Sequence, residues 1–185
     1  MEQIPEVVSS QRVFDGRIFK VRIDEIRYDD GAVHRLDIVE HGGSFGIIAL
    51  TSQRELVLVR QYRHAVRKEL WEIPAGTAHP GEDPIEGAAR ELREETGYSA
   101  GRLRLVGSCY MTPGFCDEIM HFVLAEALMP GEQALDEDER IEVGTFAHEA
   151  AWRLVGTGEI ADIKTILALL WTEGSQGELP GGFGR

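Results

Sequence analysis

Apolar and polar positions alternate along the first third of the chain, and this alternation predicts antiparallel strands. Two alternating segments, residues 17–28 and 32–40, flank Asp29-Asp30-Gly31. An Asp-Gly pair between such segments is a strong hairpin signal, because these residues tolerate positive φ. Two more apolar segments follow at residues 45–50 and 56–61. The chain is therefore expected to begin with antiparallel β structure.

Helical and strand patterns are interleaved in the rest of the chain. A short extended piece at residues 70–73 ends at Pro74-Ala75-Gly76, which we expect to break the strand. A helix follows, in which Asp83 caps the start, Pro84 suits the first position and Gly97 ends the last turn. Further strands are expected at residues 103–110, 121–125 and 142–146, and further helices at residues 148–155 and 161–171. The pattern predicts an α+β fold or a mixed sheet between helices.

Length and composition indicate one globular domain with a small appendage. The chain has 185 residues, of which 43% are apolar and 28% charged. We expect an N-terminal antiparallel β region at residues 1–42, a main domain at 43–173 and a flexible Gly-rich tail at 174–185. There is no secretory leader or apolar segment of membrane length, and Cys109 and Cys116 have no metal-ligand spacing. These features favour a cytoplasmic protein with no membrane partner.

The net charge of −13 argues against nucleic acid as a partner, because binding to nucleic acid depends largely on Lys and Arg. An acidic protein can still bind small phosphates when divalent cations bridge the two. The helix after the Pro-Ala-Gly break carries the required carboxylates. Glu91, Glu94 and Glu95 occupy positions i, i+3 and i+4 of one face, opposite an apolar stripe that would pack on the sheet.

The acidic face has two interpretations. Each like-charge pair on a helix costs roughly 0.2–0.5 kcal/mol, so a solvated face would rely on Arg90 and Arg93 for neutralisation. The alternative is a metal site, because oxygen ligands at this density suit Mg²⁺ or Mn²⁺. Gly87 lies one turn before Glu91 and would leave room for a phosphate-metal complex. We favour the metal site.

The helix and its flanks resemble a known family. Gly76, then Glu82 six positions later, then residues 90–98 (Arg-Glu-Leu-Arg-Glu-Glu-Thr-Gly-Tyr) are similar to the complete Nudix box, with Tyr98 in the final hydrophobic position. Five flanking segments are similar to the ADP-ribose pyrophosphatase branch: Glu40-His41-Gly42, Arg60-Gln61-Tyr62-Arg63, Trp71-Glu72-Ile73-Pro74-Ala75-Gly76, Thr112-Pro113-Gly114-Phe115 and residues 136–143. The resemblance implies an α/β/α sandwich with a mixed central sheet, and an N-terminal β region that helps to form a homodimer.

The resemblance also implies a ligand set for magnesium. The backbone carbonyl of Ala75 and the carboxylates of Glu91 and Glu95 would bind the metal, with Glu94 as a further ligand. Arg90 would orient these carboxylates through bidentate hydrogen bonds. Two other glutamates have less direct parts: Glu72 would shape the cavity or lie at its rim, and Glu82 would join the hydrogen-bond network.

The implied reaction is hydrolysis of ADP-ribose to AMP and ribose 5-phosphate, with another nucleoside diphosphate sugar such as GDP-mannose or ADP-glucose as the alternative. A non-catalytic nucleotide-sugar sensor is an alternative of another class. Glu137 or Glu139 would accept the proton of the attacking water. The resemblance implies substrate contacts from Arg63, Arg60, Glu118 and Phe115. Residues three apart on a strand face opposite sides, so only one of Arg60 and Arg63 is expected in the pocket.

Overall fold

The computed structural model describes residues 4–135 and 140–173, and the chain forms two compact units. The first unit comprises the described part of Met1–Gly43 together with Tyr110–Met120, and the second comprises the rest. The sequence pattern placed Tyr110–Met120 in the main domain. The segment instead pairs with the first unit, where the Val39 N–H donates to the Phe115 carbonyl at 2.7 Å. No helix within these described residues is long and apolar enough to cross a membrane.

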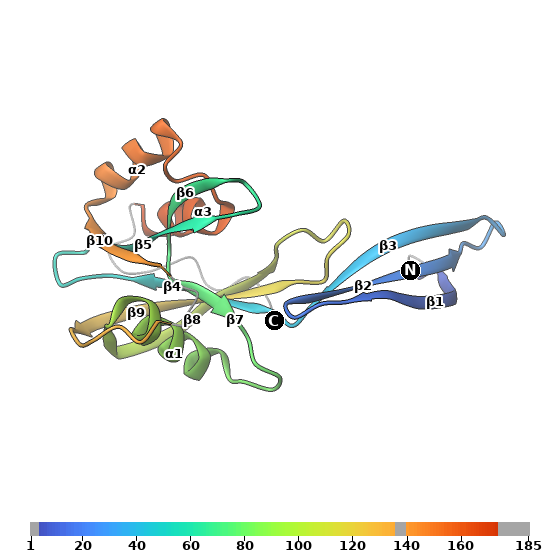
Figure 1. Ribbon diagram of the computed structural model, residues 1–185, viewed down its shortest axis with the longest axis horizontal. Helices are drawn as coiled ribbons and strands as arrows, with labels where there is room; N and C mark the ends of the chain where they lie inside the picture. Colours follow the sequence, from blue (N-terminus) through green and yellow to red (C-terminus); the bar gives the residue numbers. More distant parts are fainter. Residues whose placement is uncertain (1–3, 136–139, 174–185) are drawn as a thin grey trace. The chain divides into compact units, whose positions relative to one another are not determined.

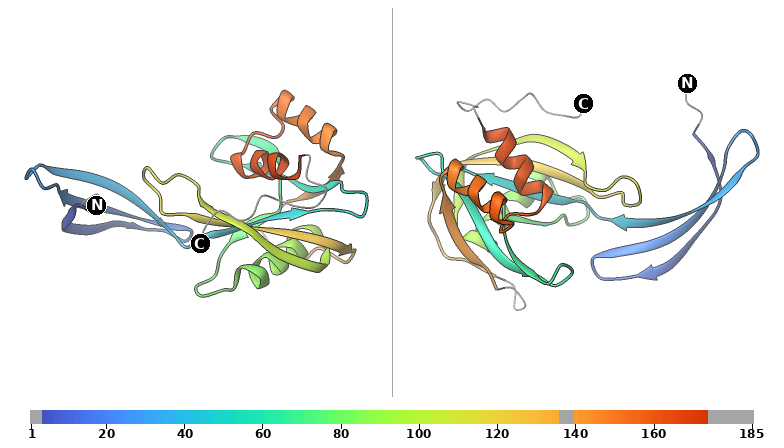
Figure 2. Two further views of the ribbon diagram at one scale, coloured as in Figure 1. Left: turned by 180° about the vertical axis from the view of Figure 1, so that it is seen from behind. Right: turned by 90° about the horizontal axis from the view of Figure 1, so that it is seen from above.

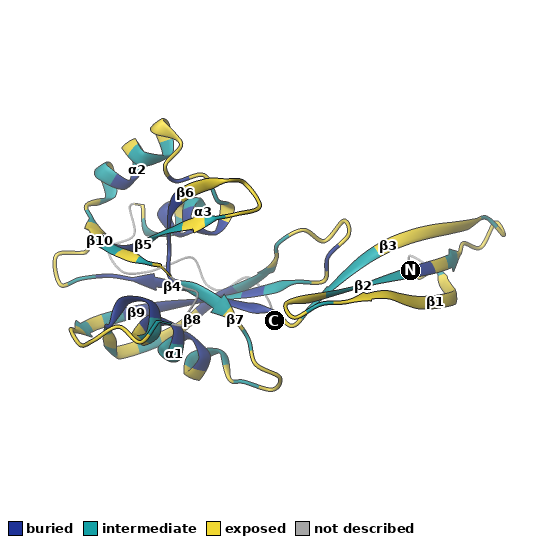
Figure 3. Cartoon of the chain, viewed as in Figure 1, coloured by how far each residue is buried: buried dark blue, intermediate teal, exposed yellow. Residues whose placement is uncertain are grey.

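The first unit is a curved antiparallel sheet in the order β1-β2-β3 (Figure 2). Its strands are β1 (Glu6–Asp15), β2 (Phe19–Arg27) and β3 (Val33–His41). The expected hairpin joins β2 to β3, with Gly31 at φ 84° in the turn. Strand β1 was not predicted. All ten of its residues are exposed, so its sequence lacks the contrast between a buried and a solvated face (Figure 3).

The second unit holds two sheets and all three helices of the described chain (Figure 1). One sheet has the order β7-β4-β9-β8 and the other the order β10-β5-β6. The strands are β4 (Ser44–Ala49), β5 (Leu56–Arg63), β6 (Lys68–Glu72), β7 (Ala75–Thr77), β8 (Ser99–Tyr110), β9 (Ile119–Met129) and β10 (Glu142–Phe146). The helices are α1 (Pro84–Thr96), α2 (His148–Thr157) and α3 (Ile163–Thr172).

Helix α1 lies on one side of the sheets and helices α2 and α3 lie on the other (Figures 1 and 2). This arrangement confirms the predicted fold class. Strand β7 was not predicted, since Pro74-Ala75-Gly76 was expected to break the chain. The carbonyl of Pro74 nevertheless accepts a hydrogen bond from the Ile47 N–H at 2.8 Å, and Gly46 pairs with Ala75. The missing N–H of proline does not prevent pairing that uses its carbonyl.

Alternating residues of β4 pack against the apolar stripe of α1. Phe45 and Ile47 on the strand, and Ala88 and Leu92 on the helix, are at most 1% exposed. The predicted ends of the helix are confirmed. The Asp83 side chain accepts hydrogen bonds from the first turn, and Gly97 ends the helix at φ 75°. The core therefore fixes α1 against β4 and sets where its polar face lies.

The space beside Gly87 serves packing, so the sequence-based interpretation of this glycine was wrong. Gly87 is buried, and a Cβ added to it would lie 2.1 Å from Cε2 of the Phe45 ring. The ring of Phe45, and no ligand, fills the space that a side chain would take. The helix can approach β4 this closely only because residue 87 has no side chain.

Gly87→Ala should therefore destabilise the protein. Overpacking of a buried site costs about 1–3 kcal/mol, whereas the better helix propensity of Ala returns at most about 1 kcal/mol. Denaturant unfolding should show a lower midpoint. Gly156→Ala is the matched control, because a Cβ there meets no atom within 4 Å, and it should unfold no more easily than the wild type. Equal stability of the two variants would show that the Phe45 ring moves aside freely.

Candidate functional site

Two of the three carboxylates on the acidic face of α1 are buried. Glu91 is 9% exposed and Glu95 is 3% exposed, whereas the side chain of Glu94 is 32% exposed. Carboxylates are almost never this buried unless they are paired or hydrogen-bonded. A solvated acidic face therefore does not describe Glu91 and Glu95.

Strand β7 contacts both buried carboxylates. The Ala75 N–H donates to Oε2 of Glu95 at 2.9 Å. One residue further on, a Cβ added to Gly76 would lie 2.0 Å from the Cδ and Oε1 atoms of Glu91. Gly76 is thus the place where the Glu91 carboxylate lies directly against the backbone. Because β7 pairs with β4, the same core that holds α1 also holds this strand beside the acidic face (Figure 1).

Arg90 connects the glutamates at the edge of the site. Its Nε and one terminal nitrogen donate to the two carboxylate oxygens of Glu82, at 2.9 and 3.0 Å. Its other terminal nitrogen donates to Glu91 at 2.7 Å and to Glu94 at 3.0 Å. The hydrogen bonds from Arg90 lower the pKa of Glu82 to about 2. The hydrogen bonds to Glu82 in turn raise the pKa of Arg90 above its ordinary value. Arg90 therefore orients Glu91 and Glu94 from a fixed position.

The donor set of this region fits a hard divalent cation. Two buried carboxylates, Glu91 and Glu95, lie one helical turn apart and face consecutive residues of β7. In residues 4–135 and 140–173, no three His, Cys, Asp or Glu side chains are grouped closely enough to hold a metal ion. Glu91 and Glu94 both accept hydrogen bonds from Arg90, and the side chain of Glu94 is the more exposed, at 32% against 12%. The buried Glu91 and Glu95 with the β7 backbone are the groups that would hold the ion, and Glu94 stays a predicted further ligand; such oxygen ligands suit Mg²⁺ and Mn²⁺.

A second buried cluster is centred on Glu72, the last residue of β6. Glu72 is 2% exposed, and its two oxygens accept hydrogen bonds from Arg63 Nε at 2.9 Å and Nη2 at 2.7 Å. The ammonium group of Lys164 also donates to Glu72 Oε2. Burial alone would raise the pKa of Glu72, but the hydrogen bonds from Arg63 and the charge of Lys164 outweigh it and lower that pKa. Glu72 is thus an ionised, buried residue and not a rim residue.

The charge of Glu95 connects the two clusters. The hydrogen bond to Glu72 raises the pKa of Arg63 most, and the charges of Glu95 and Asp162 raise it further. The Arg63 guanidinium therefore lies within electrostatic reach of the Glu95 carboxylate. A guanidinium near carboxylates that would hold a metal is suited to bind a phosphate that the metal would also contact.

Lys164 was not identified from the sequence. It lies within the apolar helix α3, is 9% exposed, and binds both Glu72 and Asp162. The available signal was an isolated lysine in an otherwise apolar helix. Such a lysine either extends its ammonium group to solvent or pairs with a carboxylate. The sequence offers Asp162, two residues earlier, as one partner, but it cannot supply Glu72, which lies far away along the chain.

Arg60 and Arg63 are separated, as the alternation of a strand requires. Arg60 forms ion pairs with Glu69 at 2.7 Å and Glu142 at 3.8 Å. These partners are distinct from the Glu72 cluster. Of the two arginines predicted to contact substrate, Arg63 is the one that joins the buried residues of the site.

Of the other four predicted residues, two belong to the first unit and two lie outside the described residues. Glu118 and Phe115 belong to the first unit. There Glu118 lies 4.0 Å from Nδ1 of His41, and Phe115, 54% exposed, lines an apolar cavity of about 270 Å³. Glu137 and Glu139, the predicted proton acceptors, lie outside the described residues.

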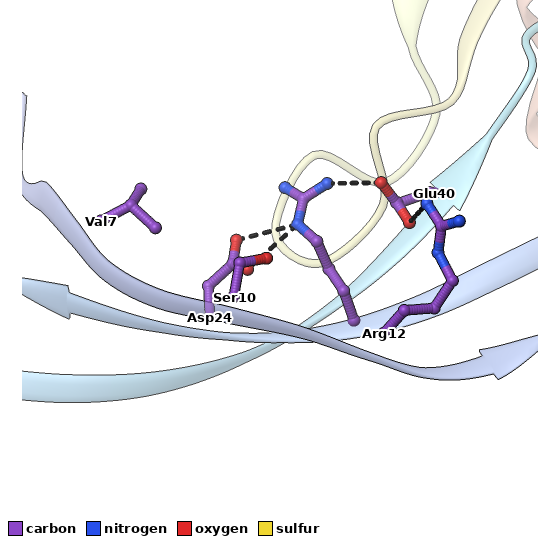
Figure 4. Close-up of a pocket in the computed structure, with 6 residues that line it drawn as sticks. Val7, Ser10, Arg12, Asp24 and Glu40 are labelled. Atoms are coloured by element: carbon purple, nitrogen blue, oxygen red, sulfur yellow. Dashed lines mark hydrogen bonds and ion pairs between the residues drawn. The ribbon is translucent and has the colours of Figure 1, made fainter.

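The first unit also has a polar pocket of about 340 Å³ (Figure 4). Arg22 bridges Asp24 at 2.9 Å and Glu40 at 2.8 Å, and Arg12 reaches Glu40 at 3.1 Å. The hydrogen bonds from Arg22 lower the pKa of Glu40. These charges neutralise one another across the concave face of the sheet.

Several proteins of related sequence or structure resemble this chain. It is 35% identical over 170 residues to an ADP-ribose pyrophosphatase of Bacillus subtilis (strain 168), covering 91% of this chain and 92% of that protein. It is also 35% identical over 170 residues to a methanol dehydrogenase activator of Bacillus methanolicus, with the same coverage. A GDP-mannose pyrophosphatase of Escherichia coli O9:H4 (strain HS) is 33% identical over 170 residues, covering 83% of this chain and 88% of that protein.

A solved structure has the same fold. The crystal structure of an ADP compounds hydrolase superposes with a TM-score of 0.81 at 23% identity, covering 91% of each chain. The family model of the NUDIX domain matches residues 40–169, which include the buried glutamates of α1, strand β7, Arg90 and the Glu72 cluster. With a family match over most of the chain and relatives at 35% identity, this protein belongs to the Nudix hydrolase family.

Proposed function

We propose that this protein hydrolyses the pyrophosphate bond of ADP-ribose to AMP and ribose 5-phosphate, with Mg²⁺ as its metal ion and Mn²⁺ as a substitute. The observation that carries the proposal is the pair of buried carboxylates, Glu91 and Glu95, held against β7, with Glu95 within electrostatic reach of Arg63. The name of the Bacillus subtilis relative supports ADP-ribose, and the name of the Escherichia coli relative supports nucleoside diphosphate sugars as the wider class.

Each residue of the site has a distinct part in this reaction. A divalent ion, when bound, would supply the Lewis acidity that neutralises charge on the pyrophosphate oxygens. Glu91, Glu95 and the carbonyl of Ala75 would hold it, and Arg90 fixes the direction of the Glu91 carboxylate. Arg63 would bind a phosphate oxygen and position the linkage for attack by water. Glu137 or Glu139 would accept the proton of that water.

A substrate panel tests this proposal. AMP release should be fastest from ADP-ribose when GDP-mannose, ADP-glucose and a diadenosine polyphosphate are assayed beside it, and EDTA should stop the reaction. The release of GMP from GDP-mannose at a higher kcat/KM would move the assignment to another nucleotide sugar. No turnover of any nucleotide sugar would reject hydrolysis. It would favour action through a partner protein, as the name of the Bacillus methanolicus relative suggests.

The proton acceptor can be assigned by comparing Glu137→Gln with Glu139→Gln. General base catalysis contributes typically about 10²–10⁴-fold, so the variant that lacks the base should lose kcat by that factor at neutral pH. We expect the larger loss for Glu137→Gln. The other variant serves as the matched control, because the same charge is removed two residues away. Similar kcat values for both variants and the wild type would place the base outside this loop.

We further propose that the protein is a homodimer formed through its N-terminal sheet. On one face of this sheet, large apolar side chains are solvent-exposed in the single chain: Phe14 (50%), Phe19 (42%) and Val33 (51%). The rings of Phe14 and Phe19 lie 5.6 Å apart, and adjoining exposed apolar side chains mark an interaction site. Light scattering should give twice the chain mass, and Phe14→Asp should shift it toward the monomer. A monomeric wild type would contradict this proposal.

A further inference from the structure

Lys164 occupies a position that is unfavourable for a positive charge. It is 9% exposed, and it is the second residue of α3, where the helix dipole opposes a cation. Replacing a buried ion pair by apolar residues of similar volume is often neutral or stabilising. Stability therefore does not explain why an ammonium group lies here.

The partners of Lys164 lead directly to Arg63. The Nζ of Lys164 donates to Oε2 of Glu72 and, at 2.8 Å, to Oδ1 of Asp162. The same Oε2 of Glu72 accepts from Arg63 Nη2 at 2.7 Å. One carboxylate oxygen is therefore shared between the buried ammonium and the guanidinium that we propose binds phosphate. The side chain of Arg63 is 40% exposed, while that of Lys164 is 11% exposed, so of the two cations Arg63 is the more accessible to a ligand.

The surroundings of Arg63 are otherwise acidic. The carboxylates of Glu72, Glu95 and Asp162 all act on its charge. With Lys164 present, two positive charges face these three negative charges. Without it, Arg63 alone would face all three and would be largely neutralised before any phosphate arrived. The buried position of Lys164 makes its contribution less sensitive to salt than that of a surface charge.

We propose that Lys164 is a positioning residue that acts through Glu72: its ammonium offsets the Glu72 carboxylate, so that the net charge around Arg63 stays less negative and the guanidinium can attract the diphosphate of the substrate. Lys164 itself does not touch the substrate. This inference rests on the proposed function, because it takes a diphosphate as the ligand of Arg63. Lys164→Met should therefore weaken diphosphate binding and raise KM, with little change in kcat.

The test measures binding apart from turnover. Calorimetric titration with α,β-methylene-ADP and Mg²⁺ gives a Kd for a diphosphate that is not hydrolysed. We expect Lys164→Met to bind about tenfold more weakly, which is roughly 1.4 kcal/mol. Lys164→Arg should bind within about threefold of the wild type, because the charge is kept. Lys20→Met is the matched control, since Lys20 lies on β2 of the first unit with its side chain 44% exposed, and its Kd should not change.

A double variant separates this inference from a structural role. Glu72→Gln/Lys164→Met removes one negative and one positive charge, so its Kd should recover to within about threefold of the wild type. A Lys164→Met protein that binds as the wild type does, or a double variant that binds no better than Lys164→Met, would overturn the inference. If Lys164→Met does not fold, Glu72→Gln replaces it in the comparison. Glu72→Gln should bind more tightly than the double variant, and equal Kd values would overturn the inference.

Failure of the proposed function has a different signature. A wild type that binds the analogue but hydrolyses no nucleotide sugar would contradict hydrolysis and leave the binding comparison valid. A wild type that does not bind the analogue would overturn the role assigned to Lys164. In turnover assays, a lower kcat of Lys164→Met with an unchanged KM would also contradict the role assigned to Lys164.

Discussion

Glu95→Gln should lower Mg²⁺-dependent turnover of ADP-ribose by at least about 10³-fold, which corresponds to roughly 4 kcal/mol of lost transition-state stabilisation. The substitution removes a negative charge from the pair that would hold the metal. Glutamine can still accept the hydrogen bond that the Ala75 N–H donates to Glu95 at 2.9 Å. The fold should therefore survive, and the midpoint of thermal unfolding without metal should be no lower than that of the wild type. Removing one of two buried like charges, Glu91 and Glu95, relieves repulsion.

The matched control for this prediction is Glu86→Gln, which removes the same charge from an exposed position of the same helix. Its kcat and its dependence on Mg²⁺ concentration should equal those of the wild type. Wild-type kcat in Glu95→Gln would reject Glu95 as a metal ligand. A large loss of stability in this variant would show instead that the charge of Glu95 is needed for folding.

Gly76→Ala should reduce activity about 100-fold and change stability little. The new methyl group would lie 2.0 Å from the Cδ and Oε1 atoms of Glu91, a distance that no real contact allows. The atom it meets is the end of a flexible side chain, so Glu91 can swing away at a small cost in stability. Its carboxylate would then move away from the strand beside which the metal would be held. Because loss of a single electrostatic contact in an active site costs about 10²–10³-fold in kcat, the assay should also show a higher Mg²⁺ requirement.

Gly156→Ala provides the comparison for Gly76→Ala as well, because its Cβ is in open space on α2. Its activity should be unchanged. Full activity of Gly76→Ala at ordinary Mg²⁺ concentrations would mean that the contact between Glu91 and β7 has no part in catalysis. Unfolding of Gly76→Ala at much lower denaturant would mean that Glu91 cannot move aside.

The helix at the centre of the site could be located from the sequence because its signals are local. Asp83 and Gly97 mark its ends, and its apolar stripe alternates with its acidic face at the helical period. Two strands, β1 and β7, could not be located from the sequence. Strand β1 has no buried face, and β7 contains a proline and a glycine that usually indicate a break. In both strands, pairing with a neighbour decides the structure, and pairing is not encoded in the local sequence.

In the candidate site, too, residues that are close along the chain could be grouped from the sequence, and residues that are distant could not. Glu91, Glu95 and Arg90 are near one another along the chain, so their helical spacing brings them together. Lys164 and Glu72 are 92 positions apart, and only the packing of α3 against the end of β6 joins them. Gly87 was misinterpreted for a related reason. The sequence shows that space is available beside this glycine, but the residue that fills it, Phe45, comes from another element.

Phe45 therefore works as a spacer between the hydrophobic core and the acidic face. Its ring lies against Gly87 of α1, and its backbone pairs with Gly76 of β7. The ring of Phe45 therefore helps to set the distance between α1 and β7, the strand that the α1 carboxylates contact. A change in side-chain volume at residue 45 would therefore be transmitted to the contact between the Glu91 carboxylate and β7. A core substitution could thus displace the carboxylates that would hold the metal, without replacing any charged residue.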